Sequence, residues 1–155
     1  MACHGFYILA DDVSPLASDN QKLFYNPSAV STKSGSFNTL KPYIQNFDGL
    51  PTIAFNKSKG ALKYIPFPKP KNNHYHCKAI IMVNYSANSK TELKKTDIKK
   101  VLEVLISESW LSPDPKHAQQ LLDWFRSIDL YQLGYSGTTS VIDTISHLFN
   151  KLDHI

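Results

Sequence analysis

The stretch Tyr75–Tyr85 reads YHCKAIIMVNY and carries the longest strand pattern in this chain of 155 residues. At its centre, Ala79–Val83 is a short apolar run of the length that a buried strand has, far below the roughly 20 residues of a membrane-crossing helix. After Ser86 the apolar residues change from strand spacing to helical spacing. The chain is therefore expected to place its strands first and its helices last.

Upstream of this stretch, the sequence predicts a β-hairpin. Pro51–Phe55 and Ala61–Phe67 are strand-like, and the five residues between them have the length of a hairpin loop with a glycine near its end. Residues 68–74 contain two prolines, which lack the donor that a sheet needs, so they predict an exposed loop.

Downstream, three segments have apolar residues at helical spacing and a capping residue at the start. They are Ile98–Ile106 after Thr96, Ala118–Phe125 after Asp114-Pro115, and Val141–Leu152 after Thr138 or Thr139. Strands followed by helices predict an α+β fold, with a small, mostly antiparallel sheet of about four strands covered by three C-terminal amphipathic helices. Without repeats or linkers, residues 1–155 are expected to form a single domain.

Composition indicates a protein that folds without covalent or metal support. Hydrophobic residues make up 42% of the chain and charged residues 19%, which argues against disorder. Cys3 and Cys77 are too few for a disulfide framework, and the N-terminus lacks the features of a secretory signal. We expect a cytoplasmic protein without a transmembrane segment; delivery into another cell by a signal-less route is left open, as is the oligomeric state.

Charge is distributed unevenly along the chain. Residues 1–48, 49–91 and 92–155 carry net charges of −1, +7 and −2, and the middle segment contains no acidic residue. All but one of the basic residues are lysines, Arg126 being the exception. Because bidentate reading of guanine edges favours arginine, sequence-specific DNA recognition is disfavoured.

The acid-free segment 49–91 is the basis of our functional expectation. Lysines alternate there with aromatic residues, so the segment predicts a non-enzymatic interaction module that contacts an acidic partner. An acidic protein is the favoured partner, and nucleic acid or an anionic lipid surface are the alternatives. The same lysines could instead protect strand edges, with the rings facing the core. The candidate binding residues are Lys57, Lys59, Lys63, Lys69, Lys71, Lys78, Tyr64 and Tyr75.

A cluster of histidine and cysteine gives the alternative, a small metal-assisted or thiol-dependent enzyme. On a strand, His74 and His76 share one face while Cys77 faces the other, so two imidazoles could bind one zinc ion. Cys3 or His4 could supply a further ligand. Cys77 could act as a nucleophile if nearby positive charge favoured its thiolate, although a small buried side chain is the commoner role.

Two weaker patterns also carry possible chemistry. Gly5–Ala10 predicts a strand that ends at Asp11 and Asp12, a position where carboxylates bind Mg²⁺ in some phosphoryl-transfer folds, but no phosphate-binding loop accompanies them and a turn is favoured. Ser136 lies in Gly-Tyr-Ser-Gly, which departs from the Gly-x-Ser-x-Gly spacing of a nucleophile elbow, so a turn is favoured there too.

The two tryptophans are possible partner contacts. Trp124 neighbours Phe125 on a predicted helix, so the two side chains point about 100° apart around its axis. An exposed tryptophan would indicate a partner surface, yet burial of Trp124 is the favoured expectation. For Trp110 the sequence favours neither outcome.

Overall fold

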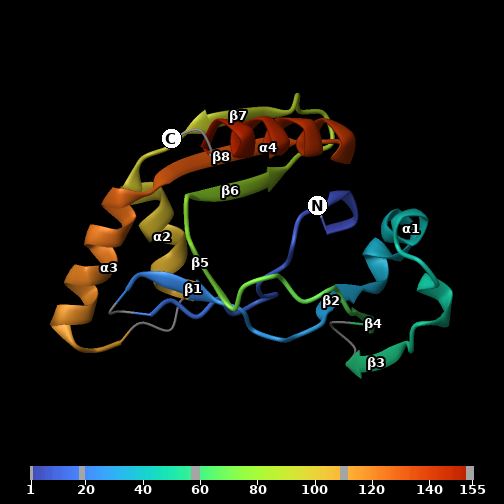
Figure 1. Ribbon diagram of the computed structural model, residues 1–155. Coiled ribbons are helices and arrows are strands. Elements are labelled where there is room, and N and C mark those ends of the chain that lie inside the picture. The colour runs from blue at the N-terminus through green and yellow to red at the C-terminus, as the bar shows by residue number, and fades with distance from the viewer. Residues whose placement is uncertain (1, 18–19, 57–59, 109–111, 153–155) are drawn as a thin grey trace. The chain divides into compact units, whose positions relative to one another are not determined.

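The computed structural model describes residues 2–17, 20–56, 60–108 and 112–152. The chain groups into two compact units, Met1–Ala17 with Leu23–Tyr75, and Ser18–Lys22 with His76–Ile155. Figure 1 labels the elements of both. Two compact units can fold as one domain, so the expectation of a single domain over residues 1–155 stays a prediction.

A three-stranded antiparallel sheet of order β2-β4-β3 forms the centre of the first unit (Figure 1). Its strands are β2 (Val30–Lys33), β3 (Ile53–Asn56) and β4 (Gly60–Ile65). The pairing of β3 with β4 confirms the predicted hairpin. Its register shifts between Ala54 and Asn56, so Phe55 lies at an irregularity of the kind that redirects a side chain.

Short helical turns connect β2 to β3. They are η2 (Ser34–Ser36), α1 (Phe37–Leu40), η3 (Lys41–Tyr43) and η4 (Phe47–Gly49). A proline within η3 and the left-handed backbone of Asn46, at φ 54°, prevent one continuous helix. The chain between β2 and β3 is therefore divided into short helical turns.

The remaining strands of the first part of the chain are short. A two-stranded sheet pairs β1 (Lys22–Phe24) with β5 (His74–His76), and η1 (Ala2–His4) begins the chain. The strand predicted at Gly5–Ala10 is wrong, because this segment joins no ladder in the described residues; Leu9 accepts one backbone hydrogen bond, from Asn26 N at 2.8 Å. An apolar run without a neighbouring strand stays irregular.

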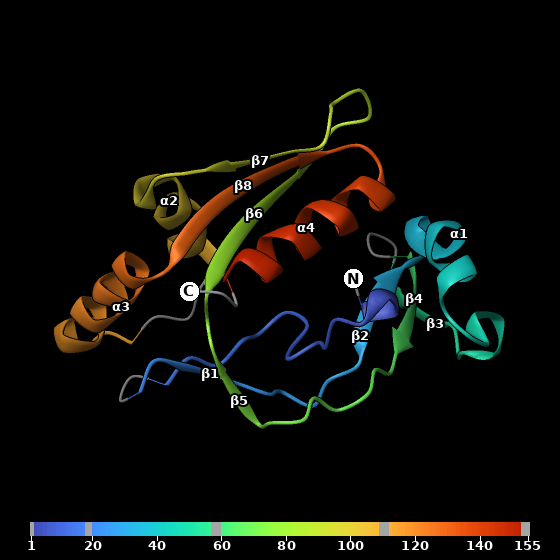
Figure 2. The ribbon, with the colours of Figure 1, turned by 45° about the horizontal axis from the view of Figure 1, so that its top comes forward.

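The second unit is built on a mixed sheet of order β6-β8-β7 (Figure 2). Its strands are β6 (Ala79–Tyr85), β7 (Glu92–Lys95) and β8 (Asp129–Tyr135). The pairing of β8 is parallel with β6 and antiparallel with β7. The predicted strand Tyr75–Tyr85 is thus divided, with Cys77 and Lys78 separating β5 from β6.

Three helices in this unit confirm the predicted helical patterns. They are α2 (Ile98–Glu108), α3 (Pro115–Ser127) and α4 (Thr138–Leu152). Asp114 caps α3 as predicted, accepting a hydrogen bond from Lys116 N at 2.9 Å. At the start of α2, Asp97 accepts from Lys100 N at 3.1 Å in place of the expected Thr96.

One face of the mixed sheet packs on α4. Tyr131 of β8 and Leu148 of α4 form a buried cluster, against which Ala79, Ile81 and Leu93 pack. Figures 1 and 2 show α4 lying along this sheet. The α4 pattern was predicted, whereas β8, which supplies the central strand, was not.

The fold class is confirmed in its coarse form and corrected in its detail. Helices and strands are both present and most strand pairs are antiparallel, but the eight strands of the described residues form three small sheets instead of one sheet of about four. β8 also lies between α3 and α4, so the strands do not all precede the helices. Within the described ranges, no helix is both long enough and apolar enough to cross a membrane.

Candidate functional site

Four of the six predicted binding lysines are among the described residues, and these four occupy three different settings. Lys57 and Lys59 lie outside the described residues. Lys69 and Lys71 are exposed in the first unit, and Lys78 is exposed in the second. Lys63 is buried. The acid-free segment is therefore divided between the two units.

The loop of residues 66–73, between β4 and β5, holds two of the exposed lysines at fixed positions. Lys69 and Lys71 flank Pro70, whose ring is buried. Asn72 N donates to the hydroxyl oxygen of Tyr75 at 3.0 Å, and the carbonyl oxygen of Asn73 accepts from Tyr25 N at 2.8 Å. Prolines and these anchors restrict the backbone, so the two ammonium groups extend from a preorganised loop. Tyr75, a predicted binding residue, thus stabilises this loop through its hydroxyl group.

No carboxylate of the described residues forms an ion pair with these lysines. In the described part of the chain, Lys69, Lys71 and Lys78 make no ion pair. The ion pairs that are present use basic residues outside 49–91, namely Lys41, Lys94, Lys95 and Arg126. Folding thus brings no described acid to the exposed lysines of the acid-free segment.

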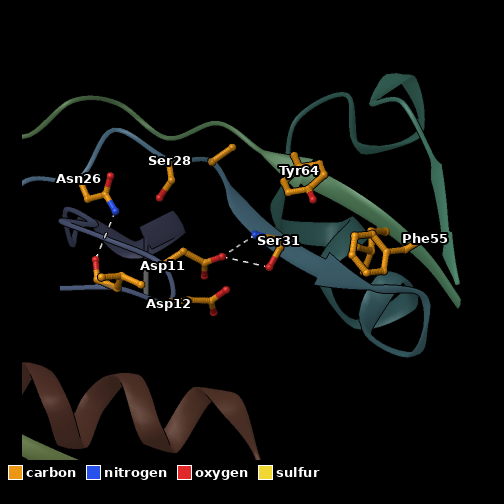
Figure 3. Close-up of a pocket in the computed structure, with 10 residues that line it drawn as sticks. Asp11, Asp12, Asn26, Ser28, Ser31, Phe55 and Tyr64 are labelled. Carbon is orange, nitrogen blue, oxygen red and sulfur yellow. Dashed lines mark hydrogen bonds between the residues drawn. The ribbon is translucent and has the colours of Figure 1, made fainter. Parts of the chain in front are cut away.

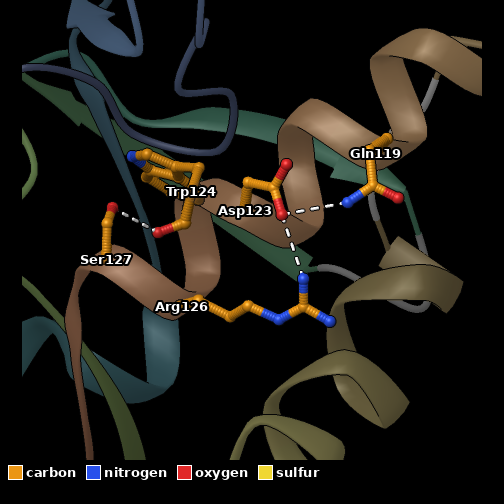
Figure 4. Close-up of polar contacts among 5 residues, drawn as sticks. All are labelled: Gln119, Asp123, Trp124, Arg126 and Ser127. Carbon is orange, nitrogen blue, oxygen red and sulfur yellow. Dashed lines mark hydrogen bonds and ion pairs between the residues drawn. The ribbon is translucent and has the colours of Figure 1, made fainter.

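The single arginine is held within its own helix. Figure 4 shows Asp123 of α3 accepting hydrogen bonds from Gln119 Nε2 at 2.9 Å and Arg126 Nη1 at 3.0 Å. Nearby, the Ser127 hydroxyl donates to the carbonyl oxygen of Trp124 at 2.7 Å. Arg126 is therefore paired with a carboxylate of its own helix, unlike the exposed lysines of the acid-free segment.

Lys63 differs from the other lysines because only 5% of it is exposed. Its Nζ atom lies 5.4 Å from the centroid of the Phe47 ring and 5.8 Å from that of Phe37. The ammonium group also donates a hydrogen bond to the carbonyl oxygen of Leu50. Two ring faces and one carbonyl oxygen hold this cation inside the first unit, so it does not face a partner.

A pocket of about 400 Å³ opens on the other face of the same sheet (Figure 3). Asp11 lines the pocket, and its Oδ2 atom accepts hydrogen bonds from Ser31 N at 2.9 Å and from Ser31 Oγ at 3.0 Å. The exposed carboxylate of Asp12 also lines the pocket. The two carboxylates favour neutral or cationic groups here and disfavour phosphate.

Two aromatic rings line the same pocket. Phe55 is 51% exposed and Tyr64 is 42% exposed. Tyr64 is the cross-strand partner of Ser31, which places the predicted binding residue Tyr64 beside the Asp11 contact. The sequence could not indicate this arrangement, because Asp11 and Ser31 are 20 residues apart and share no motif.

Among the described side chains, the predicted metal ligands His4, His74 and His76 do not gather into a metal-binding group. His74 and His76 both lie on β5 with exposed side chains, as their spacing predicted. The His74 ring packs against Phe24 at 5.6 Å between centroids, and the His4 ring lies 6.0 Å from that of Tyr43. Among the described residues, no three histidine, cysteine, aspartate or glutamate side chains could hold one metal ion. The side chain of Cys3 is outside the description.

The surroundings of Cys77 disfavour the thiolate that a nucleophilic cysteine needs. It is partly buried, and its Sγ atom donates to the carbonyl oxygen of Ala79 at 3.4 Å. Burial raises the pKa of the Cys77 thiol above its usual value, outweighing the opposing effect of the hydrogen bond at Ala79. At neutral pH the thiolate is therefore scarce.

Ser136 directly follows strand β8. β8 leads directly into this turn and α4 follows it, so the strand–turn–helix order of a nucleophile elbow is present. However, the Ser136 hydroxyl donates to the carbonyl oxygen of Ser89 at 2.7 Å. This bond joins two loops and favours a structural role for Ser136.

Burial of Trp124 is confirmed. Trp124 and Phe125 are both buried, with ring centroids 5.1 Å apart. Trp110, for which the sequence favoured neither outcome, lies outside the described ranges. Trp124 is therefore part of the core and does not indicate a partner surface.

Comparison with known proteins adds no relationship to this geometry. No family model, curated protein or solved structure matches the chain.

Proposed function

We propose that this protein is a non-enzymatic interaction module that binds an acidic protein through the loop of residues 66–73. The observation that carries the proposal is the exposure of Lys69 and Lys71 on both sides of a buried proline, without a described carboxylate paired to either. Preorganisation lowers the entropic cost of placing two positive charges against a partner. Lys57, Lys59 and Lys78 belong to the same acid-free segment of the sequence.

An acidic protein suits these residues better than nucleic acid does. Sequence-tolerant binding of single strands combines phosphate contacts with aromatic rings that are open for base stacking. Here Tyr75 accepts a hydrogen bond from the loop, and the exposed rings of Phe55 and Tyr64 share a pocket with Asp11 and Asp12, whose charges repel phosphate. The sole arginine is offset by Asp123.

The enzyme alternative gains no support from the described residues. Burial disfavours the Cys77 thiolate, and no group of three ligands gathers among the described side chains. We therefore retain the binding module as the proposed function.

The test is a comparison of two double variants with the same charge change. Lys69→Glu/Lys71→Glu alters the loop, whereas Lys99→Glu/Lys100→Glu alters exposed lysines of α2 that also make no described ion pair. Binding of fluorescent poly-glutamate is measured at several salt concentrations. The loop variant should weaken binding roughly tenfold and flatten the salt dependence, and the α2 variant should weaken it much less.

Two outcomes would contradict the proposal. Equal losses in both double variants would mean that only net charge matters. Tighter, loop-dependent binding of a single-stranded RNA or of phosphatidylserine vesicles would replace the acidic protein with that partner class.

A further inference from the structure

Strand β6 forms one edge of the mixed sheet and lacks the features that usually protect an edge. In the order β6-β8-β7, it is paired on one side by β8, and no strand of the described residues lies on its other side (Figure 2). Its seven residues, AIIMVNY, include no charge and no proline, and its register with β8 is continuous from Ala79 to Tyr85, without a bulge. Charges, prolines and bulges are the common protections against edge pairing.

The hydrogen bonds at both ends of β6 show which backbone groups face outward. Asp129 N donates to the carbonyl oxygen of Lys78 at 3.2 Å, and Ser86 N donates to that of Tyr135 at 2.9 Å. In a parallel ladder, every second residue of a strand directs its backbone groups to the neighbouring strand. Because Lys78 and Ser86 bond to β8, the even-numbered residues of β6 also bond to β8. The N–H and C=O groups of Ile81, Val83 and Tyr85 therefore point to the open edge.

The outward-facing carbonyl group of Ala79, the first residue of β6, already has a hydrogen-bond partner. The carbonyl oxygen of Ala79 accepts from the Cys77 thiol at 3.4 Å. The part of the edge that is open to pairing accordingly runs from Ile81 to Tyr85, where the described residues make no further backbone hydrogen bond.

The same end of β6 exposes apolar side chains. Val83 is 67% exposed and Tyr85 is 62% exposed. Tyr85 contacts Tyr135 edge to face, with ring centroids 5.6 Å apart, and still leaves most of its ring accessible. Open backbone groups and exposed apolar side chains thus coincide at Val83 and Tyr85.

The opposite edge of the sheet is protected. β7 has four residues and carries Glu92, Lys94 and Lys95. Lys94 pairs with Glu92 at 2.9 Å, and Lys95 pairs with Asp129 at 3.0 Å. A short, charged edge of this kind resists pairing, whereas the β6 edge permits it.

We propose that β6 pairs antiparallel with β6 of a second copy of this chain, with the two-fold axis at Val83. In this register Val83 faces its own copy and Tyr85 faces Ile81 of the other copy. Outward-pointing residues then oppose each other, so their backbone groups bond, and each exposed apolar side chain meets an apolar neighbour. This self-association goes beyond the proposed function and does not depend on it.

Two features favour a second copy over another occupant. The acidic partner proposed above would find no positive charge on β6, because the strand is uncharged. A two-fold pairing also leaves the charged β7 strands at both ends of a joined six-stranded sheet, so association stops at the dimer.

The experiment combines molecular mass in solution with hydrogen exchange. Light scattering on a sizing column should give a dimer for the natural chain, a monomer for Val83→Lys, and a dimer for Ile106→Lys. Ile106 is a matched control because it is 61% exposed on α2. A lysine at the axis places two like charges opposite each other and desolvates both.

Hydrogen exchange supplies a test without a mutation. Raising the concentration from monomer to dimer should slow exchange of the Ile81, Val83 and Tyr85 amides about tenfold or more. The Met82 and Asn84 amides, which bond to β8, should change little. A natural chain that stays monomeric at all concentrations, a dimeric Val83→Lys variant, or concentration-independent exchange at the odd residues would overturn the proposal.

Discussion

The Nζ atom of Lys63 lies 5.4 Å from the centroid of the Phe47 ring, inside the first unit and without a described carboxylate partner. Phe37 contributes a second ring at 5.8 Å, and Leu50 contributes a carbonyl oxygen. Burying a cation costs free energy unless its surroundings replace the lost water. The electron-rich ring faces and the carbonyl oxygen provide that replacement.

Substitutions at Lys63 should therefore distinguish the effect of its buried charge on the free energy of unfolding from the effect of its side-chain volume. Lys63→Met keeps much of the volume and removes the buried charge, so the free energy of unfolding should change by no more than about 1 kcal/mol. Lys63→Glu places a negative charge against the two ring faces and should cost at least about 3 kcal/mol. Urea denaturation followed by circular dichroism measures both.

The control is Lys33→Glu on the exposed face of the same sheet. It should change the free energy of unfolding by less than about 0.5 kcal/mol. If Lys63→Glu is tolerated as well as Lys33→Glu, the buried position of the ammonium group is refuted.

The contact between Asp11 and Ser31 predicts a graded loss of stability. Ser31→Ala removes the hydroxyl donor and keeps the backbone N–H, so it should cost about 1 kcal/mol. Asp11→Ala removes both hydrogen bonds and should cost about 2 kcal/mol. Chemical denaturation of each variant gives these values.

Asp12→Ala provides the comparison for that series. Asp12 is the exposed neighbour of Asp11 and makes no described hydrogen bond or ion pair. Its removal should leave the free energy of unfolding almost unchanged. An equal loss for Asp11→Ala and Asp12→Ala would contradict the assignment of the contact to Asp11.

The sequence predicted elements whose signals are local. The Asp114-Pro115 start of α3 and the hairpin of β3 and β4 follow from capping and turn chemistry within a few residues. The sharing of one face by His74 and His76 likewise follows from strand periodicity.

The sequence did not predict which distant segments of the chain contact one another. β8 is a seven-residue strand whose partners are β6 and β7, so nothing local distinguishes it from a helix terminus or a loop. Burial of Lys63 depends on Phe37 and Phe47, and the pocket depends on Asp11 reaching Ser31. Each requires knowledge of which distant segments meet.

Through its contacts with Lys95 and Tyr131, Asp129 makes the stability of the fold depend on pH in the alkaline range. Its hydrogen bond with Lys95 and its charge raise the pKa of Lys95 above 10.5. Burial first, and then Asp129, raise the pKa of Tyr131 above 10.0. In both cases the unfolded chain loses its proton at a lower pH than the folded chain, so stability is lost as pH rises above about 10.

Asp129→Asn should make that alkaline loss shallower, with a remainder due to the burial of Tyr131. Denaturation at a series of pH values between about 8 and 11 measures the slope. Asp123→Asn is the control, because its partner Arg126 stays protonated throughout this range. An unchanged slope in Asp129→Asn would refute the linkage.

The burial of Cys77 predicts that its thiol reacts slowly with alkylating reagents. Burial raises its pKa above 9.0, so the thiolate fraction near pH 7 is smaller than that of an exposed cysteine. In a Cys3→Ser background, iodoacetamide should modify Cys77 about tenfold or more slowly than it modifies glutathione. The rate should rise as pH passes 9 and should reach that of an ordinary thiol in denaturant, where burial is lost. Modification of the folded chain faster than glutathione would mean an activated thiol, and the enzyme alternative would then displace the binding module.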